Sequence, residues 1–271
     1  MLVKRQSGVP QFYCTEYADK QSDYVVLIPV INEGERLHRE LMRSKTNQIS
    51  ECADIVICDG GSTDGSVEDS VLQGMGVNTL LVKDDYGKQG AQLRMGIWWA
   101  LQRNYKGIIT IDGNDKDSIE DIPHFISKLE EGYDFVQGSR FVKGGRAVNT
   151  PLIRFLALRL VHAPIISMTA HQRFTDTTNA FRGYSKKYLE DPRVEPLRDE
   201  FQTYELLAYL SVRATQLRMK ACEIPVTRAY PPKGKIPTKI SFFKGNCNLL
   251  KILIKNAAGS YKPDNDMRRG V

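Results

Sequence analysis

The sequence predicts an α/β protein with a mostly parallel central sheet, helices on both faces of that sheet and a helical C-terminal arm. Short apolar runs alternate with segments of helical composition along residues 23–226. Within each run the apolar residues are consecutive and do not alternate with polar ones, which is typical of strands buried on both faces in a parallel sheet. Polar loops rich in Gly and Asp follow several runs. In an open α/β sheet such loops meet at one edge, where ligands bind.

The first strand is predicted at Tyr24–Val30, because YVVLIPV is a continuous apolar run. A helix over 35–46 follows it. The unit then repeats as a strand, a glycine-rich turn and a helix, at 54–58, 60–65 and 66–74. Two such units in succession indicate βαβ winding. Residues 1–22 are polar and irregular, and we expect a loosely ordered lead-in there.

The winding continues through the middle of the chain. A helix opens after Gly87-Lys88-Gln89-Gly90 and carries Leu93, Ile97 and Leu101 on one face, which is the pattern of a core helix. This part is predicted as strand, helix, strand, helix and strand, at 79–82, 91–103, 107–111, 119–131 and 134–138. Beyond Gly145 we predict a helix, a polar loop, a helix and a last strand, at 150–169, 175–184, 201–214 and 222–226.

Residues 227–271 are predicted to form a basic arm with a flexible loop and an amphipathic helix. Pro, Lys and Gly dominate the loop at 231–238. The helix over 242–258 places apolar side chains opposite lysines, as at a membrane interface; the two sets are Phe242, Phe243, Leu249, Leu250, Leu253 and Ala257 against Lys244, Lys251 and Lys255. The alternative is a helix docked on its own domain or on a second subunit. In the second case the protein would be a homo-oligomer.

Composition bounds the class of protein. The 271 residues are 41% hydrophobic, enough for one large domain, and the five cysteines are odd in number and lack CxxC spacing, which favours a reducing, cytoplasmic location. No signal peptide is expected at the start. Segment 152–170 is the best candidate for a membrane span, but Arg154, Arg159, His162 and Pro164 interrupt it, so we do not expect it to cross a membrane.

The basic excess is concentrated in the arm. Residues 226–271 hold ten Lys/Arg and two Asp, which is +8, against +6 for the whole chain. An anionic lipid or a phosphorylated ligand is therefore a plausible partner for the arm, and a merely solubilising tail is the alternative. The arm lacks interleaved aromatics and the chain shows no nucleic-acid-binding motif, so we expect no nucleic-acid partner.

The strongest candidate site follows the strand at 107–111. That strand runs directly into Asp112, Asn114 and Asp115, with more acidic residues up to Asp121. Carboxylates at the open end of a buried strand can hold a cation that neutralises a phosphate. A solvated acidic turn that caps the next helix is the alternative. We assign the part from Asp117 onward to the cap and Asp112 to Asp115 to function.

The loops together supply the groups that a metal-bridged, phosphate-bearing substrate needs. They offer carboxylates, amides and cations: Glu33, Asp59, Asp64, Asp112 and Asp115; Asn32 and Asn114; Lys88, Arg94, Arg140, Lys143 and Arg182. No Walker A loop, GxGxxG, GxSxG or HExxH motif is present, which argues against a P-loop enzyme, a dinucleotide oxidoreductase, a serine hydrolase and a zinc protease. The four histidines are scattered and are read as non-catalytic.

Four stretches together resemble the family 2 nucleotide-sugar glycosyltransferases of the GT-A fold: VVLIPVINEGE at 25–35, ICDGGSTDGS at 57–66, GKQGAQLRMGI at 87–97 and IDGND at 111–115. Three later ones resemble the dolichyl-phosphate mannosyltransferase, or polyprenyl-phosphate glycosyltransferase, branch: QGSRFVKGG at 137–145, DTTNAFRGYS at 176–185 and FQTYELL at 201–207. The match runs from about Val25 to Lys239.

The resemblance implies roles for individual residues. Pro29, Asn32, Glu33 and Asp59 fall around the nucleotide base and ribose, with Lys88 among the donor-binding cations. Asp112 and Asn114 fall on the DxD motif, which binds Mg²⁺ or Mn²⁺ and the diphosphate. The positions that hold phosphate groups are Ser139, Arg140, Arg154 and Arg182, and Lys239 meets the donor. Asn114 replaces the second Asp, so Asp115 is a substitute metal ligand or metal binding is weak.

The implied reaction transfers a sugar, with inversion, from a UDP- or GDP-sugar to a polyprenyl phosphate. A lipid phosphate is already an anion and attacks without a general base, so the site mainly positions and stabilises anions, with Asp112 and Arg140 central. The alternative acceptor is a saccharide hydroxyl, which needs a carboxylate base from Asp176, Glu200 or Glu205. A lipid acceptor implies a peripheral enzyme on the cytoplasmic membrane face, attached through the C-terminal arm.

Overall fold

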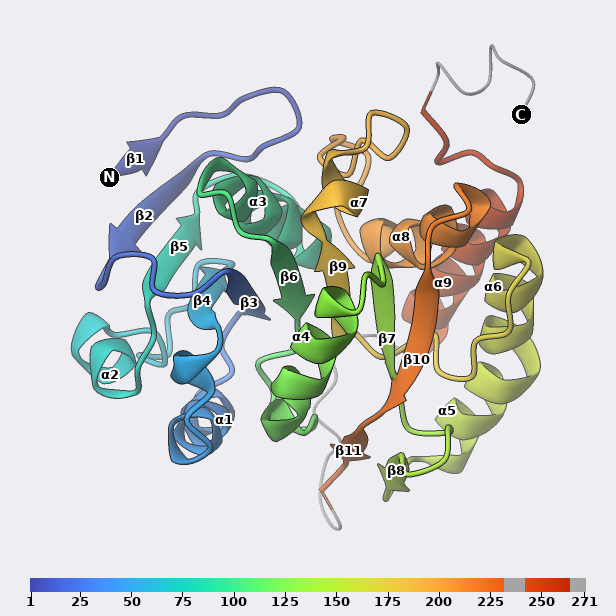
Figure 1. Cartoon of the computed structure of the whole chain (residues 1–271), viewed down its shortest axis with the longest axis horizontal. Helices are drawn as coiled ribbons and strands as arrows, with labels where there is room; N and C mark the ends of the chain where they lie inside the picture. Colours follow the sequence, from blue (N-terminus) through green and yellow to red (C-terminus); the bar gives the residue numbers. More distant parts are fainter. Residues whose placement is uncertain (232–241, 264–271) are drawn as a thin grey trace.

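The computed structural model, which describes residues 1–231 and 242–263, is built on one nine-stranded sheet (Figure 1). The strand order is β1-β2-β5-β4-β3-β6-β9-β7-β10. β3, β4, β5 and β6 run parallel, as do β7 and β10, so the predicted mostly parallel sheet is confirmed. The bounds are β1 Leu2–Val3, β2 Phe12–Glu16, β3 Tyr24–Val30, β4 Asp54–Asp59, β5 Thr79–Lys83, β6 Gly107–Thr110, β7 Phe135–Ser139, β9 Arg182–Ser185 and β10 Ala221–Pro225.

Helices cover both faces of this sheet, as predicted. One apolar core lies between the sheet and α3 (Gln89–Gln102), α6 (Ala163–Ala170), α8 (Glu205–Gln216) and α9 (Phe242–Ala257). A second core lies on the other face, under α1 (Glu35–Thr46), α2 (Asp69–Gly74) and α4 (Ile122–Glu130). Successive residues of β4 alternate between the two cores, Val56 and Cys58 in the first, Ile55 and Ile57 in the second. This burial on both sides explains the unbroken apolar runs.

The N-terminal prediction was wrong. Residues 1–22 are not a loose lead-in, because β2 pairs antiparallel with β5 and extends the sheet. The reason is a period-two pattern in a short segment: Phe12 and Cys14 are buried and Tyr13 is exposed. Phe12 also makes an edge contact with Trp98 of α3.

A second strand lay in a segment that we predicted as a polar loop. β9 runs antiparallel between β6 and β7, and three of its four residues fall inside the region 175–184. Tyr184 of β9 and the preceding Phe181 are fully buried, and Gly183 lets the ring of Phe125 lie close to the backbone. A four-residue strand without an apolar run gives too little signal for sequence analysis.

Helices α6, α8 and α9 and strand β10 lie in the right-hand part of the molecule in Figure 1. A helical segment over 152–170 consists of α5 (Leu152–Ala157), a π-helical turn (Leu158–His162) and α6. Smaller elements are β8 (Arg146–Val148), which pairs in parallel with β11 (Thr227–Ala229), helix α7 (Lys186–Glu190) and 3₁₀ turns at Ile49–Glu51 and Ile119–Asp121.

The C-terminal helix lies against its own domain. Ile252 and Leu253 are buried, and Asn256 Nδ2 donates to the carbonyl oxygen of Ala208 at 2.8 Å. The docked alternative is therefore confirmed for this face of α9. The predicted loop at 231–238 lies outside the described residues from 232 on, as do Lys239 and the side chains of Phe242, Phe243 and Lys244.

Candidate active site

The motif loops meet where the winding of the sheet reverses. The chain passes from β3 to β4 and then β5 on one side, and α3 carries it back to β6 on the other side of β3. The carboxyl ends of parallel strands beside such a reversal are the usual ligand-binding edge of an open α/β sheet. The loops after β3, β4 and β6 hold the residues that the sequence analysis selected.

The loops after β3 and β4 are bonded to each other. Asp59 is buried and accepts hydrogen bonds from the main-chain N–H groups of Gly61 and Ser62, both at 2.9 Å. Asn32 donates its N–H to Ser62 Oγ at 2.9 Å and accepts from the N–H of Thr63 at 2.8 Å. Asn32 and Asp59 therefore shape one double loop, at the place predicted for the nucleoside. Gln92 of α3 fixes the start of the double loop, because its Nε2 donates to the carbonyl oxygens of Val30 and Cys58. Glu33 pairs with Arg36, and Pro29 lies within β3.

Asp112 follows β6 and is held from two sides. Gln89 Nε2 donates to Oδ1 at 2.9 Å, and Arg228 Nη2 donates to Oδ2 at 3.1 Å. Burial raises the pKa of Asp112, but Arg228 and Lys116 outweigh it and the pKa lies below its ordinary value. The side chain is 21% exposed, so this carboxylate can meet a ligand.

Four cations surround the phenol of Tyr230. The charged groups of Lys116, Arg154 and Arg228 lie 5.4, 5.7 and 6.0 Å from the ring centre. Although burial raises the pKa of Tyr230, the charges of Arg228, Arg154 and Arg140 lower it below its ordinary value. The potential at the phenol is therefore net positive, which favours a phosphate group. We call Lys116, Arg140, Arg154 and Arg228 the Tyr230 cluster.

Arg140 and Asp176 are paired with each other. Arg140 Nε and Nη2 donate to the two carboxylate oxygens of Asp176 at 2.6 and 2.8 Å, and the Arg140 main-chain N–H donates to Oδ2 at 3.1 Å. Both side chains are buried. Asp176 therefore does not fit the predicted role of general base, since its lone pairs are committed to a guanidinium. Arg140 acts on the site through its charge.

Arg182 and Asp115 do not fit their predicted roles. Arg182 is fully buried and donates to the carbonyl oxygens of Asn179 at 2.9 Å and Thr177 at 3.0 Å, so it supports the backbone rather than a diphosphate. Asp115 has a left-handed backbone, φ 57°, and pairs with Arg39 and Arg43 of α1 at 2.9 and 3.0 Å. Its carboxylate is therefore unsuited to bind a metal beside Asp112.

The remaining predicted residues are divided between loop structure and the surface. Ser139 is buried, bonded to Thr175 Oγ1 at 2.6 Å and to the N–H of Phe141 at 3.0 Å. Lys88 precedes α3 and is exposed. Arg154 donates to the Tyr230 hydroxyl at 3.5 Å, within the Tyr230 cluster.

The donor atoms suit a divalent cation only at the first two of the three predicted ligands. Asn114 Oδ1 is buried without a hydrogen-bond partner, in a residue whose main-chain N–H donates to the carbonyl oxygen of Asp112 at 2.9 Å; the carboxylate of Asp112 is partly open. Mg²⁺ in such sites takes one or two protein oxygens and completes its shell with phosphate and water. Within residues 1–231 and 242–263, no group of three or more His, Cys, Asp or Glu side chains forms a metal cage. The fit is therefore to a metal that arrives with a phosphate-bearing ligand.

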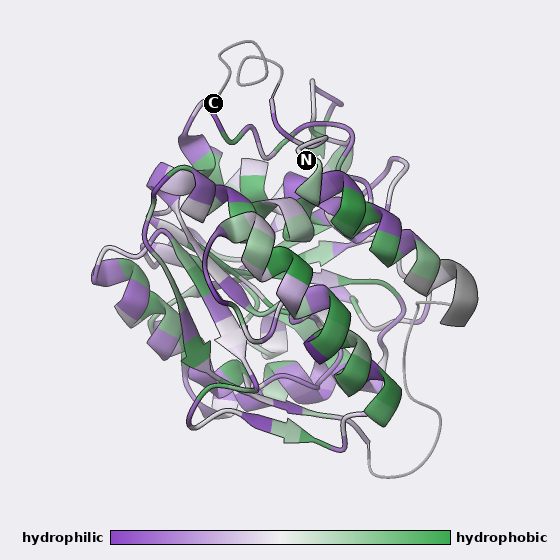
Figure 2. Cartoon of the chain, turned by 90° about the vertical axis from the view of Figure 1, so that its right-hand side faces the viewer, coloured by the Kyte–Doolittle hydropathy of each residue, from purple (hydrophilic) through white to green (hydrophobic). Residues whose placement is uncertain are grey.

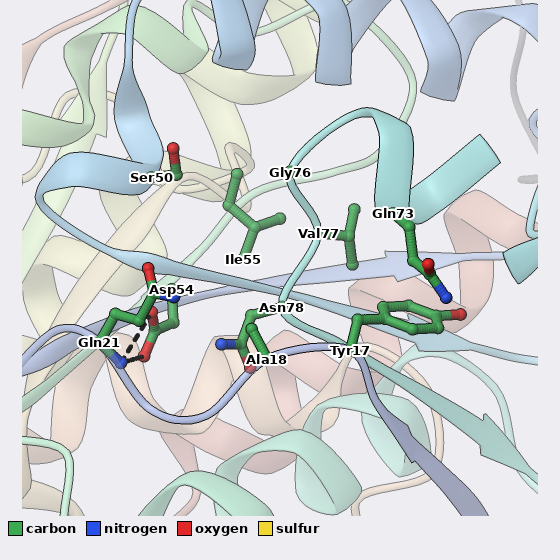
Figure 3. A pocket seen from close by; sticks show the side chains of 10 residues that line it. All are labelled: Tyr17, Ala18, Gln21, Ser50, Asp54, Ile55, Gln73, Gly76, Val77 and Asn78. Carbon is green, nitrogen blue, oxygen red and sulfur yellow. Dashed lines mark hydrogen bonds between the residues drawn. The ribbon is translucent and has the colours of Figure 1, made fainter. Parts of the chain in front are cut away.

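The hollow shown in Figure 3 lies elsewhere. It has a volume of about 390 Å³ and is lined by residues such as Tyr17, Asp54 and Asn78. Asp54 begins β4, so this hollow is at the opposite end of the strand from Asp59. Asp54 already accepts from the N–H of Gln21 at 3.0 Å and from the Tyr105 hydroxyl at 2.7 Å. These bonds are structural.

Sequence reasoning missed Gln89, Arg228 and Tyr230 as site residues. Arg228 and Tyr230 directly follow the last predicted strand, at the same edge as the motif loops, which was the available signal. The prediction assigned everything after residue 226 to a flexible arm and so overlooked it.

A sheet edge that combines two hydrogen-bonded loops, a strand-end carboxylate and a cationic cluster suits an enzyme that handles nucleotide-linked groups. The chain belongs to the glycosyl transferase family 2, whose model matches residues 25–192. It is therefore a glycosyltransferase, and the sequence resemblance is confirmed.

Two relatives cover most of the chain. Polyprenol monophosphomannose synthase of Mycolicibacterium smegmatis is 24% identical over 258 residues, 91% of this chain and 90% of the relative. Undecaprenyl-phosphate mannosyltransferase of Micrococcus luteus is 25% identical over 206 residues, 75% of this chain and 82% of the relative. Both names match the branch that the later motifs resemble.

Solved structures of similar fold include glucosyl-3-phosphoglycerate synthase from Mycobacterium tuberculosis. Its complex with Mn²⁺, UDP and glucosyl-3-phosphoglycerate has a TM-score of 0.56 at 15% identity, with 87% of this chain and 80% of that chain covered. The complex with UDP has a TM-score of 0.60 at 14% identity, with the same shares covered. At this identity the likeness establishes the GT-A fold.

Proposed function

We propose that this glycosyltransferase moves a sugar from a nucleoside-diphosphate donor to a polyprenyl phosphate, with inversion at the anomeric carbon. The observation that carries the proposal is the Tyr230 cluster beside Asp112. A concentration of guanidinium and ammonium groups suits two anionic substrates held side by side. The names of the two curated relatives, one acting on polyprenol phosphate and one on undecaprenyl phosphate, support the same acceptor class.

The state of the carboxylates argues against a hydroxyl acceptor. Asp176 is committed to Arg140. Glu200 pairs with Arg198 at 2.5 Å, and Glu205 accepts from Thr203 Oγ1 at 2.7 Å. A sugar hydroxyl must lose its proton to a base, whereas a phosphate oxygen attacks as an anion. The engagement of all three candidate bases therefore favours the lipid phosphate.

The chain's own residues divide the work. The double loop of Asn32 and Asp59 receives the nucleoside, and Asp112 with Asn114 would hold a divalent cation at the diphosphate. That ion, Mg²⁺ or Mn²⁺, would supply positive charge to the departing nucleoside diphosphate. Arg154 and Arg228 orient the acceptor phosphate and offset the charge of the two anions as they approach. Arg140 raises the local positive potential from behind them.

The proposal includes a place at the membrane. A polyprenyl chain is confined to a bilayer, so the enzyme works as a peripheral protein at the membrane surface. The five unpaired cysteines support the cytoplasmic side.

The test is a transfer assay. The purified chain is incubated with a panel of UDP- and GDP-sugars and either undecaprenyl phosphate in detergent or soluble saccharides, and the product is extracted into an organic phase. We expect label in an acid-labile lipid phosphate with one nucleotide sugar. Transfer to saccharides alone would refute the proposed acceptor, and no transfer with any donor would refute the pairing of substrates.

A further inference from the structure

Large apolar side chains are unusually exposed on one helical segment of this enzyme. Of sixteen exposed large hydrophobic residues among the described ones, seven lie between residues 152 and 168: Leu152, Ile153, Phe155, Leu156, Leu160, Val161 and Met168. Leu160 is 71% and Met168 75% exposed. Single exposed apolar residues are ordinary, but a contiguous group marks an interaction surface.

These side chains form a stripe along the helix. Leu152, Leu156 and Leu160 follow one another at four-residue spacing, which places each next to the previous one along a helix surface, and Met168 continues the exposed set further along the segment. The opposite side packs on the domain, where Ile166 and Ala170 join the core under α8 and α9. Figure 2, which faces this side of the molecule, shows the segment crossing the front as a largely hydrophobic helix. We call this stripe the α5–α6 face.

The segment is long and apolar enough to cross a membrane by length and composition, and only 17% of its most apolar 18-residue window is buried against the domain. Its α6 part contacts α8 and α9 on the inner side, so the helical segment lies along the body of the domain in this structure. It can lie in the interface with its outer side in the acyl region.

The charged residues near the α5–α6 segment indicate which kind of partner binds its exposed face. Residues 135–175 contain six Lys/Arg and no Asp or Glu. Four of these basic residues, Lys143, Arg146, Arg159 and Arg173, are exposed and lie before, within or just after the helical segment in the chain. We call these four residues the basic rim; an apolar stripe in a stretch of chain whose charges are all basic complements a bilayer with anionic headgroups.

The α5–α6 face also begins at the candidate active site. Arg154, a member of the Tyr230 cluster, sits in the first turn of α5 between the exposed residues Ile153 and Phe155. A lipid phosphate bound at Arg154 and Tyr230 would therefore have its chain next to the stripe, in the bilayer.

We infer that the α5–α6 face is the surface by which this enzyme docks on an anionic bilayer. The reason for the enzyme to dock on a membrane rests on the proposed lipid acceptor. The choice of the α5–α6 face as the docking surface rests on the exposed stripe and the basic rim. It differs from the sequence prediction, which placed membrane contact on the basic arm and α9. The buried face of α9 instead packs on the domain, and only Leu250 and Ile254 remain as large exposed apolar side chains among its described positions.

The experiment measures flotation of the full chain with vesicles of equal parts phosphatidylcholine and phosphatidylglycerol, and with phosphatidylcholine alone. We expect the wild type to float with the mixed vesicles and to dissociate as salt is raised. The double variant Leu156→Glu/Leu160→Glu should partition about tenfold or more weakly, because two leucines that would enter the bilayer are replaced by anions. Leu156→Phe/Leu160→Phe should float like the wild type.

Met42→Glu on α1 is the matched control, since Met42 is 52% exposed on another part of the surface. It should not change flotation. All variants must keep the wild-type circular dichroism, which is expected because the substituted side chains are exposed. Flotation of the double glutamate variant at the wild-type level would overturn the inference. The inference would also be overturned if the wild type did not bind vesicles but formed a dimer, and the double variant Leu156→Glu/Leu160→Glu were monomeric.

Activity on a short, water-soluble prenyl phosphate separates this inference from the proposed function. The double glutamate variant should retain that activity although it no longer binds vesicles. A wild type that binds vesicles but glycosylates no prenyl phosphate would refute the proposed acceptor and leave the docking surface standing.

Discussion

Replacing Arg228 with glutamine is expected to destabilise the fold by about 3–5 kcal/mol near neutral pH. Arg228 is buried and pairs with both Asp117 and Asp112. Asp117 is fully buried, and its Oδ1 already lacks a hydrogen-bond partner. Removal of the guanidinium would leave an uncompensated carboxylate inside the domain. The measurement is the free energy of unfolding from urea titration of wild type and Arg228→Gln.

The loss should depend on pH in a defined direction. Burial raises the pKa of Asp117 to about 6, against 3.8 for an ordinary Asp, although Arg228 lowers it. Because the folded-state pKa lies above the unfolded one, stability falls as pH rises between about 4 and 6. Without Arg228 the pKa rises further, so the fall should continue above pH 6. The destabilisation should be larger at pH 8 than at pH 5.

The double variant Arg228→Gln/Asp117→Asn removes both charges and should recover most of the lost stability. Its turnover should nevertheless be about 10²-fold lower than that of the wild type, because the Tyr230 cluster has lost a member. A loss below about 1 kcal/mol in Arg228→Gln, or an equal loss at both pH values, would refute the reasoning about the buried pair.

Further predictions concern other parts of the site and the fold. Asp112→Asn should lower turnover by about 10²-fold or more while the unfolding free energy changes by less than about 1 kcal/mol, because the side chain is partly exposed; unfolding of this variant would contradict its assignment. Asp59→Ala should raise the donor KM about tenfold by releasing the double loop, and an unchanged KM would argue against a nucleoside site there. Burial and Arg182 lower the pKa of His162 to about 4, so stability should decline by up to about 3 kcal/mol as pH falls from 6.5 to 4, and His162→Gln should flatten that decline in acid denaturation curves. Chelation with EDTA should abolish transfer, and Mn²⁺ should restore it; full activity in EDTA would exclude the proposed ion.

Much of the scaffold can be predicted from the sequence, because a parallel strand that is buried on both faces consists of consecutive apolar residues. β3, β4 and β6 and the loops behind them were predicted on this basis, and so was Asp112 as a strand-end carboxylate. Short strands that carry little apolar sequence, such as β9, depend on pairing with distant partners. Their position emerges only once the rest of the sheet exists.

The partners of charged side chains were not predictable for the same reason. Arg140 meets Asp176 across 36 residues, and Arg228 meets Asp117 across 111. Residue type alone offered Arg140, Arg154 and Arg182 equally as phosphate ligands. Their hydrogen-bond partners separate them, because the guanidinium of Arg182 donates to carbonyl oxygens, that of Arg140 to Asp176 and that of Arg154 to the Tyr230 hydroxyl.

Whole-segment charge also concealed the membrane face. The net charge of −2 over residues 1–225 hid a stretch of six basic and no acidic residues at 135–175, since acidic residues elsewhere offset it. Local charge matters more than the average, because the Debye length at physiological salt is about 8 Å.

The charges at the site explain why a divalent cation is expected. Four positive groups act at Tyr230, and three carboxylates are paired with them: Asp112, Asp117 and Asp176. One net positive charge remains, whereas a diphosphate and a lipid phosphate bring at least three negative ones. Glu40, behind the Asp112 loop, adds little negative charge because burial raises its pKa well above the ordinary value. Protein cations alone therefore leave the two substrates repelling each other, and an ion that enters with the donor at Asp112 supplies the missing charge.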